Sequence, residues 1–225
     1  MGGRDEFLQR VRQAVAAGNR HSGAVEHPRR GDCGYQGAGA DAAARYGAEL
    51  KSAGGYFYQV TDAAAARDQV LAIIRNKSAR KVLVGTGSLM ESLQLADALR
   101  AAGVHVDKVS DLDEDNAAAV FFNADLNVTG ADFLIAETGS LVYLSRPDEP
   151  RSASLLAPVH VAVATTSQLL PDLFDLFERL PPNAALLPGC VSIITGPSKT
   201  GDIELKLVTG VHGPGELHVI LIAAE

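Results

Sequence analysis

The chain has 225 residues, of which 47% are hydrophobic, and it carries a formal net charge of −7 with a pI near 5.4. This length suits one α/β domain, or one domain with an N-terminal appendage, and the composition is that of a globular protein. The negative charge and the lack of a basic stripe argue against nucleic-acid binding. No apolar run approaches the roughly 20 residues that cross a membrane as a helix.

The cysteines and the N-terminus restrict the cofactors and the compartment. Cys33 and Cys190 lie far apart in sequence, and neither belongs to a CxxC pair. We therefore expect no iron–sulfur or zinc–thiolate site and no cofactor in this chain. The first residues are charged and lack the apolar segment of a signal peptide, which favours a cytoplasmic protein.

The N-terminal region is predicted to form a helix and a loop. Apolar residues recur at helical spacing over residues 4–17, namely Phe7, Leu8, Val11 and Val15. Residues 19–40 are rich in Gly and Arg and have no period, which predicts a loosely packed, mobile loop. We therefore divide the chain into an appendage at 1–40 and a domain at 41–225.

From residue 41 onward, helical and strand patterns alternate. Helices are predicted at 41–53, 62–76 and 89–100, with Thr61 as the N-cap of the second, and strands at 56–60, 81–84 and 104–106. A short helix is expected between 111 and 127. This alternation predicts a largely parallel sheet covered by helices on both faces.

The second half of the chain predicts six more strands and one long helix. The strands are expected at 127–129, 133–136, 141–144, 159–163, 191–194 and 217–222, and the helix at 169–180. The near-continuous apolar runs 81–84, 159–163 and 191–194 predict buried strands of one mostly parallel sheet. Residues 146–151 predict a charged surface loop.

Two Gly-containing turns are candidate sites. Gly85, Thr86, Gly87 and Ser88 join a strand to a helix, where free backbone N–H groups can bind a carboxylate or phosphate; a plain tight turn is the alternative.

Glu137 follows an apolar segment and precedes Thr138, Gly139 and Ser140. Partial burial there would raise the pKa of this carboxyl and suit acid–base or nucleophilic work, unless Glu137 only caps neighbouring N–H groups.

A polar cluster near the C-terminus is the third candidate site. It comprises Ser198, Lys199, Thr200, Asp202 and Glu204. Lys199 could bind a substrate carboxylate. Thr200 as an N-cap and Gly210 as a stop favour a short helix here, although the alternating apolar residues at 203–207 also allow a strand.

His212 lies in a constrained turn close to this cluster, and His218 alternates with apolar residues as a core or cross-strand residue would. His212, His218, Glu216 and Asp202 are zinc-ligand types, but their spacing is not a zinc motif, so we expect no metal.

Three segments together carry a resemblance to a known family. They are Glu137-Thr-Gly-Ser-Leu141, Thr195-Gly-Pro-Ser-Lys-Thr-Gly-Asp-Ile-Glu204 and Gly210-Val-His-Gly-Pro-Gly-Glu-Leu-His-Val219. They resemble the signature segments of the LUD-domain family, in particular its lactate utilization C subfamily. The resemblance covers about residues 40–225, and the last segment is the most specific of the three.

The resemblance implies an α/β sandwich like the NagB/RpiA/CoA-transferase group. It also implies a bacterial subunit that works with iron–sulfur partner proteins in oxidising L-lactate to pyruvate and binds a small carboxylate or a partner through its loops. A stand-alone enzyme acting on an acyl-CoA or phosphosugar, with Glu137 as nucleophile or base, is the alternative, and a purely structural subunit is a third reading. Under the first reading we expect Glu137 and Lys199 to face one cavity beside residues 85–88, because such loops converge beyond the carboxyl ends of parallel strands.

Overall fold

The computed structural model describes two compact units of the chain, residues 1–35 and 36–225. The described residues are 3–18, 37–113, 115–201 and 208–223. The first unit contains helix α1 (Gly3–Gly18), on which Phe7, Val11 and Val15 are exposed. The helix predicted at 4–17 is therefore confirmed, while most of the loop predicted at 19–40 lies outside the described residues. Among the helices of the described ranges, none is long and apolar enough to cross a membrane.

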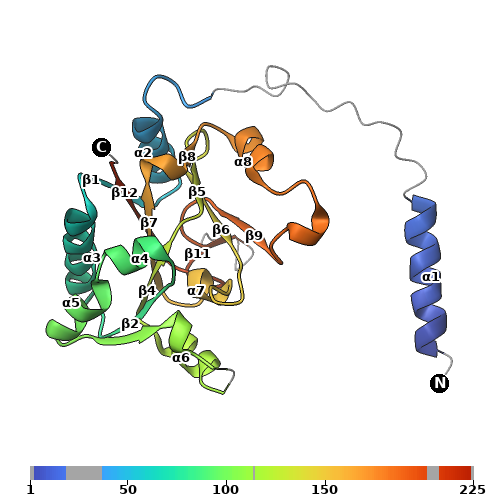
Figure 1. Ribbon diagram of the computed structural model, residues 1–225, viewed down its shortest axis with the longest axis horizontal. Coiled ribbons are helices and arrows are strands. Elements are labelled where there is room, and N and C mark those ends of the chain that lie inside the picture. Colours follow the sequence, from blue (N-terminus) through green and yellow to red (C-terminus); the bar gives the residue numbers. More distant parts are fainter. Residues whose placement is uncertain (1–2, 19–36, 114, 202–207, 224–225) are drawn as a thin grey trace. The chain divides into compact units, whose positions relative to one another are not determined.

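A six-stranded parallel sheet forms the centre of the second unit, in the order β1-β12-β7-β4-β2-β3 (Figure 1). Its strands are β1 (Tyr56–Val60), β2 (Lys81–Val84), β3 (His105–Lys108), β4 (Leu126–Gly130), β7 (Val159–Thr165) and β12 (Glu216–Ile222). The inner strands are almost continuously apolar because both of their faces are covered. The predicted parallel sheet covered by helices is thus confirmed.

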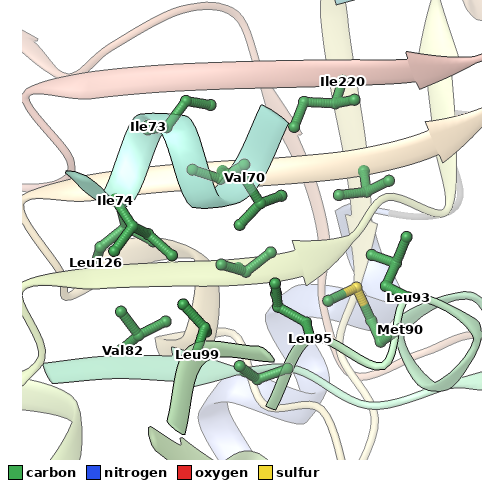
Figure 2. Close-up of a cluster of buried hydrophobic side chains, with 14 of the residues drawn as sticks. Val70, Ile73, Ile74, Val82, Met90, Leu93, Leu95, Leu99, Leu126 and Ile220 are labelled. Atoms are coloured by element: carbon green, nitrogen blue, oxygen red, sulfur yellow. The ribbon is translucent and has the colours of Figure 1, made fainter. Parts of the chain in front are cut away.

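Three helices cover one face of this sheet: α3 (Ala63–Lys77), α4 (Ser88–Ser92) and α5 (Leu95–Ala101). Figure 2 shows their side chains packed over the strands: Val70, Ile73, Ile74, Met90, Leu93, Leu95 and Leu99 lie against Val82, Leu126 and Ile220. Each fully buried aliphatic side chain contributes about 1.5–3 kcal/mol. This layer therefore supplies a large part of the stability of the unit.

The opposite face is covered by helices and by a second sheet (Figure 1). The helices are α2 (Ala42–Ser52), α6 (Ala117–Asn123) and α7 (Ser152–Leu155). The second sheet has the order β8-β5-β6-β9, with β5 (Phe133–Ile135), β6 (Ser140–Leu144), β8 (Leu169–Leu170) and β9 (Val191–Ile194). Helix α8 (Leu173–Arg179) packs on this sheet through Leu176. Short 3-10 turns lie at η3 (Val109–Asp111), η4 (Thr166–Gln168) and η5 (Ala184–Leu186).

The position of residues 191–194 corrects the sequence prediction. They form a strand, but β9 pairs antiparallel with β6 at the edge of the second sheet and not in the parallel sheet. Ile193 is 44% exposed. A short run with three apolar residues out of four indicates a strand without showing which sheet it joins or whether both faces are covered, and this ambiguity produced the error.

Several helix boundaries also differ from the prediction. The helix predicted at 89–100 is divided into α4 and α5, because Gln94 has φ +49°. The N-cap of α3 is Asp62 and not Thr61: the Asp62 carboxylate accepts from the Ala65 N–H at 2.8 Å. Leu169 and Leu170 belong to β8 and do not start the last helix.

The region of the C-terminal polar cluster contains a short hairpin. Strand β10 (Lys199–Thr200) pairs antiparallel with β11 (Val208–Thr209). The helix predicted to begin at Thr200 is therefore wrong at these residues, and residues 202–207 lie outside the described ranges. Local capping signals favoured the helix, but cross-strand pairing with residues farther along the chain determines the conformation.

Two buried histidines lie in the parallel sheet. His160 Nε2 is hydrogen-bonded to Thr129 Oγ1 at 2.8 Å, and burial, together with the nearby His218, lowers the pKa of His160 to about 4. His218 stacks on Tyr56 and is hydrogen-bonded to Tyr58 and Glu216. Its prediction as a core residue with cross-strand partners is confirmed, and burial lowers the pKa of His218 as well.

Replacing Val161 by Asp should abolish soluble expression, because Val161 is 0% exposed between covered faces and a charge there cannot be solvated. Ile193→Asp is the matched control, and it should express and melt within a few degrees of the wild-type protein because Ile193 is 44% exposed. Expression and thermal melting of both variants measure this. A folded Val161→Asp protein would contradict the assignment of β7 to the sheet interior.

The free energy of unfolding should decrease as the pH falls from about 6.5 to about 4. The unfolded chain protonates His160 near its ordinary pKa of 6.5, whereas folded His160 stays neutral until pH about 4. The unfolded state therefore binds more protons in this window, which costs the fold up to about 3 kcal/mol.

Urea unfolding at pH 7 and pH 5 measures this loss. His160→Gln should show a clearly smaller loss than the wild-type protein, with the remainder due to groups such as His218, whose pKa is also lowered. Equal losses in both proteins would contradict the role of His160.

Candidate functional site

A cavity of about 360 Å³ opens beyond the carboxyl ends of β2 and β4. From β2 the chain continues to β3 on one side, and from β4 it continues to the second sheet and then to β7 on the other side. The connections from these two adjacent strands thus run in opposite directions, which makes this place a topological switch point, where open α/β sheets bind their ligands. The lining residues are Thr86, Gly87, Ser88, Leu89, Gly130, Ala131, Asp132, Tyr143, Arg146, Asp148, Glu149 and Gln168.

Glu149 is the most unusual side chain of this cavity, since it is a carboxylate that is only 4% exposed. Its Oε2 accepts hydrogen bonds from the Thr86 N–H at 2.6 Å and from the Thr86 hydroxyl at 2.5 Å. Within the described part of the chain, its buried Oε1 has no hydrogen-bond partner. A Cβ at Gly85 would lie 2.5 Å from Oε1, so glycine makes room for the carboxylate.

Residues 146–148 and 151 are exposed, as a charged surface loop would be, but Glu149 in the same loop is buried. The contact of Glu149 with Thr86 shows which acceptor the N–H and hydroxyl of Thr86 have. The N–H of Thr86 is already donated to a carboxylate of the same chain, that of Glu149. Thr86, Gly87 and Ser88 line the cavity, and Gly85 packs directly against the Glu149 carboxylate.

Asp132 and Arg146 form the second polar pair of the cavity. The Arg146 guanidinium donates to Asp132, whose other oxygen accepts from the Leu144 N–H at 2.7 Å. The Arg146 side chain remains 47% exposed, so it can still meet a ligand at the mouth. The main chains of Arg146 and Glu149 exchange two hydrogen bonds of 3.0 and 3.1 Å, which places both side chains on one turn.

Tyr143 and Gln168 complete the walls. The Tyr143 hydroxyl donates to the Pro150 carbonyl at 3.2 Å, and burial together with the Glu149 carboxylate raises the pKa of Tyr143 far above its ordinary value. Tyr143 is therefore a protonated donor and not a base. Gln168 donates to the Ala131 carbonyl and accepts from the Thr165 N–H, which ties η4 to the end of β4.

The charge balance of the cavity indicates what it can bind. Asp132, Asp148 and Glu149 line it together with one cation, Arg146. A ligand that brings hydroxyl or amino donors is favoured by this balance, and a carboxylate would have to meet Arg146 at the exposed mouth. The arrangement suits binding and orientation of a small polar molecule.

Glu137 lies away from this cavity. It is half-buried at the turn between β5 and β6, and its N–H donates to the Pro171 carbonyl at 3.1 Å. Phe133 pairs with Val142 and Ile135 with Ser140, so Asp132 and Glu137 lie at opposite ends of the β5–β6 hairpin.

The rest of the Glu137 turn has a packing role. The hydroxyls of Thr138, Ser140 and Thr195 form a chain with distances of 2.7 and 2.6 Å. A Cβ at Gly139 would lie 2.2 Å from the Leu50 nitrogen, so this glycine, with φ +64°, lets the turn contact the main chain of α2.

The Lys199 side chain also packs at α2 and not at the cavity. Its Nζ donates to the carbonyl of Ala53, the C-cap of α2, at 2.5 Å, where a cation complements the helix dipole. The loops at 137–140 and 195–199 thus both contact α2, through Gly139 and Lys199 respectively. Among the described residues that line the cavity between β2 and β4, however, neither Glu137 nor Lys199 is present, so this cavity is not the predicted one that they share with 85–88.

Ser198 and His212 belong to a different region. Ser198 donates its N–H to the Pro214 carbonyl at 2.8 Å, which joins the segments 198–200 and 210–215. His212 lines a groove of about 560 Å³ near the starts of β7 and β12, together with Phe122, Leu156 and Val211. Thr200 pairs with Val208, and Asp202 lies outside the described residues. Over the described ranges, no group of three or more His, Cys, Asp or Glu side chains could hold a metal ion.

Sequence reasoning did not find Asp132, Arg146, Glu149 and Gln168. Asp132 stood between two predicted strands and Glu149 in a charged loop, where exposed carboxylates are ordinary. The available signal was positional: Asp132 closely follows β4, and residues that follow a strand of a parallel sheet lie at its carboxyl edge.

Gly85→Ala should destabilise the protein by about 1–3 kcal/mol through overpacking against Glu149. In a Glu149→Ala background the same substitution should cost less than half as much, because the nearest obstructing atom is gone. Urea unfolding of the four proteins of this double-mutant cycle gives the coupling. Additive effects would show that the Gly85–Glu149 contact does not constrain this position.

Comparison with known proteins places the chain in a family. The model of the LUD domain family matches residues 43–222. Lactate utilization protein C of Anoxybacillus flavithermus is 31% identical over 163 residues, which are 72% of each chain. Lactate utilization protein C of Halalkalibacterium halodurans is 43% identical over 94 residues, but this segment spans only 40% of the present chain and 41% of that relative.

The solved structure of a DUF162 family protein from Deinococcus radiodurans has the same fold. It aligns with a TM-score of 0.58 at 21% identity and covers 80% of this chain and 96% of that one. Sequence motifs, the family model and the fold therefore agree, and the chain belongs to the LUD domain family.

Proposed function

We propose that this chain takes part in lactate utilization, as a subunit that binds a small ligand in the cavity between β2 and β4. The observation that carries the proposal is its likeness to a protein named for lactate utilization over 72% of both chains. The cavity lies where the connections from β2 and β4 run to opposite sides of the sheet, and this position supports the ligand-binding role. In this proposal a small carboxylate ligand meets Arg146 at the mouth.

The finer part of the proposal concerns the partners. The chain acts in the cytoplasm with iron–sulfur subunits that oxidise L-lactate to pyruvate, as the family resemblance implies. This chain has two cysteines, whereas an iron–sulfur cluster takes four thiolate or equivalent ligands. The clusters are therefore assigned to the partners, and no resident cofactor is assigned to this chain.

The alternative is a stand-alone enzyme that acts on an acyl-CoA or phosphosugar through Glu137. The geometry favours it less, because Glu137 lies at the far end of the β5–β6 hairpin from the cavity. The hydroxyl chain of Thr138, Ser140 and Thr195 beside Glu137 is explained by packing against α2.

Deleting the gene should abolish or strongly slow growth on L-lactate and leave growth on glucose unchanged. Rescue with Arg146→Ala should restore growth on lactate only partly, because the one cation lining the cavity among the described residues is lost. Arg151→Ala is the matched control: it removes the same charge from an exposed neighbouring position that does not line the cavity, and it should rescue fully.

Growth rates of these strains decide between the two functions. Normal growth of the deletion strain on lactate would contradict the proposed role. Failure of Glu137→Gln to rescue, with full rescue by Arg146→Ala, would favour the enzyme that uses Glu137.

A further inference from the structure

A second cavity, of about 310 Å³, lies at the carboxyl ends of β2 and β3 and shares Thr86 with the first. It is lined by Val84, Gly85, Thr86, Met90, Glu91, Gln94, Leu95, Ala96, Asp97, Lys108 and Ser110. Its volume falls at the lower end of the range of small-molecule sites. The functional argument above does not use it.

The floor and the rim of this cavity differ in chemistry. Val84, Met90, Leu95 and Ala96 are all buried and form an apolar floor. Figure 2 shows Met90 and Leu95 in the layer over the sheet. The rim is polar and consists of Glu91, Gln94, Asp97, Lys108 and Ser110. A flat apolar ring with polar edges matches this combination, and a methionine floor adapts well to an aromatic ring.

Gln94 is the strained residue of the rim. It has φ +49° and ψ +35°, the left-handed conformation that glycine adopts without cost, and it separates α4 from α5. The break between the two helices leaves the opening that the cavity occupies. Strained backbone of this kind concentrates at ligand sites, and the glutamine amide offers one acceptor and two donors.

We infer that this second cavity binds an adenine nucleotide. The ring rests on the apolar floor, and the Gln94 amide pairs with the base edge, as Gln does with adenine N6 and N7. The carboxylates of Glu91 and Asp97 accept from the ribose hydroxyls. Lys108 lies on the rim and holds the phosphate with its positive charge. The Thr86 N–H of the neighbouring turn does not take this role, because it is already donated to Glu149.

The topology supports the same assignment. β2, the helices α4 and α5, and β3 form one crossover between adjacent parallel strands. Mononucleotide-binding halves of doubly wound sheets hold the nucleoside at the ends of two such strands. The inference goes beyond the role in lactate utilization and does not depend on it.

Calorimetric titration of the full chain with AMP, adenosine and inorganic phosphate tests the assignment. AMP should bind, adenosine should bind more weakly, and inorganic phosphate should not displace AMP at equal concentration. Lys108→Ala should weaken AMP binding and leave adenosine binding unchanged. Gln94→Gly should weaken AMP binding about tenfold, because the contact with the base edge is lost.

Ser78→Gly is the control for the backbone. Ser78 also has a positive φ, of +53°, and it lies outside the lining of this cavity. Both glycine substitutions should raise the Tm by relieving the left-handed conformation, but only Gln94→Gly should weaken AMP binding.

Three results would overturn the inference. They are no heat of AMP binding at millimolar concentration, unchanged AMP affinity in Gln94→Gly, and displacement of AMP by an equal concentration of phosphate, which would leave only an anion contact at Lys108. In a separate titration with GMP, an affinity equal to that for AMP would overturn the adenine assignment.

Discussion

The pairing of β12 between β1 and β7 is the constraint on which the rest of the second unit depends. Strand β12 exchanges main-chain hydrogen bonds with β1 from Tyr56 to Val60 and with β7 from Val159 to Thr165. In the described sheet order β12 is the one strand that pairs with β1, and it is the last strand of the described residues. Helices α2 and α3 flank β1 in sequence and pack on the faces that β12 completes. Formation of this sheet therefore requires contacts between residues more than 150 positions apart, which makes folding of the unit cooperative and dependent on its C-terminal strand.

The direction of the strands separates the loops of the sheet into two groups. The turn at 85–88 follows β2 and lies at the carboxyl edge, whereas the segment 210–215 precedes β12 and lies at the amino edge. The most specific family motif, at 210–219, therefore lies away from both cavities at the carboxyl edge and is bonded instead to Ser198 and to the start of β7 through Pro158. A motif can mark a family because its main chain packs closely, without its side chains forming a ligand site.

The sequence was sufficient to predict the parallel sheet, because helical and strand periods alternate clearly from β1 to β4 and the central strands are continuously apolar. It was insufficient for β9 and for the β10–β11 hairpin, where partners distant in sequence determine the structure of short segments with ambiguous patterns. The position of Thr86, Gly87 and Ser88 at the cavity could be predicted because a Gly-containing turn that follows a parallel strand lies at the carboxyl edge of the sheet. Glu149 was missed because its burial depends on Gly85, 64 positions earlier, and no local pattern reports that contact.

The contact between Glu149 and Thr86 gives the turn at 85–88 a different role from that of a phosphate-binding loop. In such loops the free N–H groups at the start of a helix attract a ligand anion. Here the carboxylate of the same chain accepts both donors of Thr86, so an added anion would lose this attraction and meet a negative charge instead. The turn then acts as a wall that separates two cavities of different chemistry, one with Arg146 as its cation and the other with Lys108. Under the two proposals above, an anionic group in either cavity would be held by the cation of that cavity, so substitutions of Arg146 and Lys108 should have separable effects.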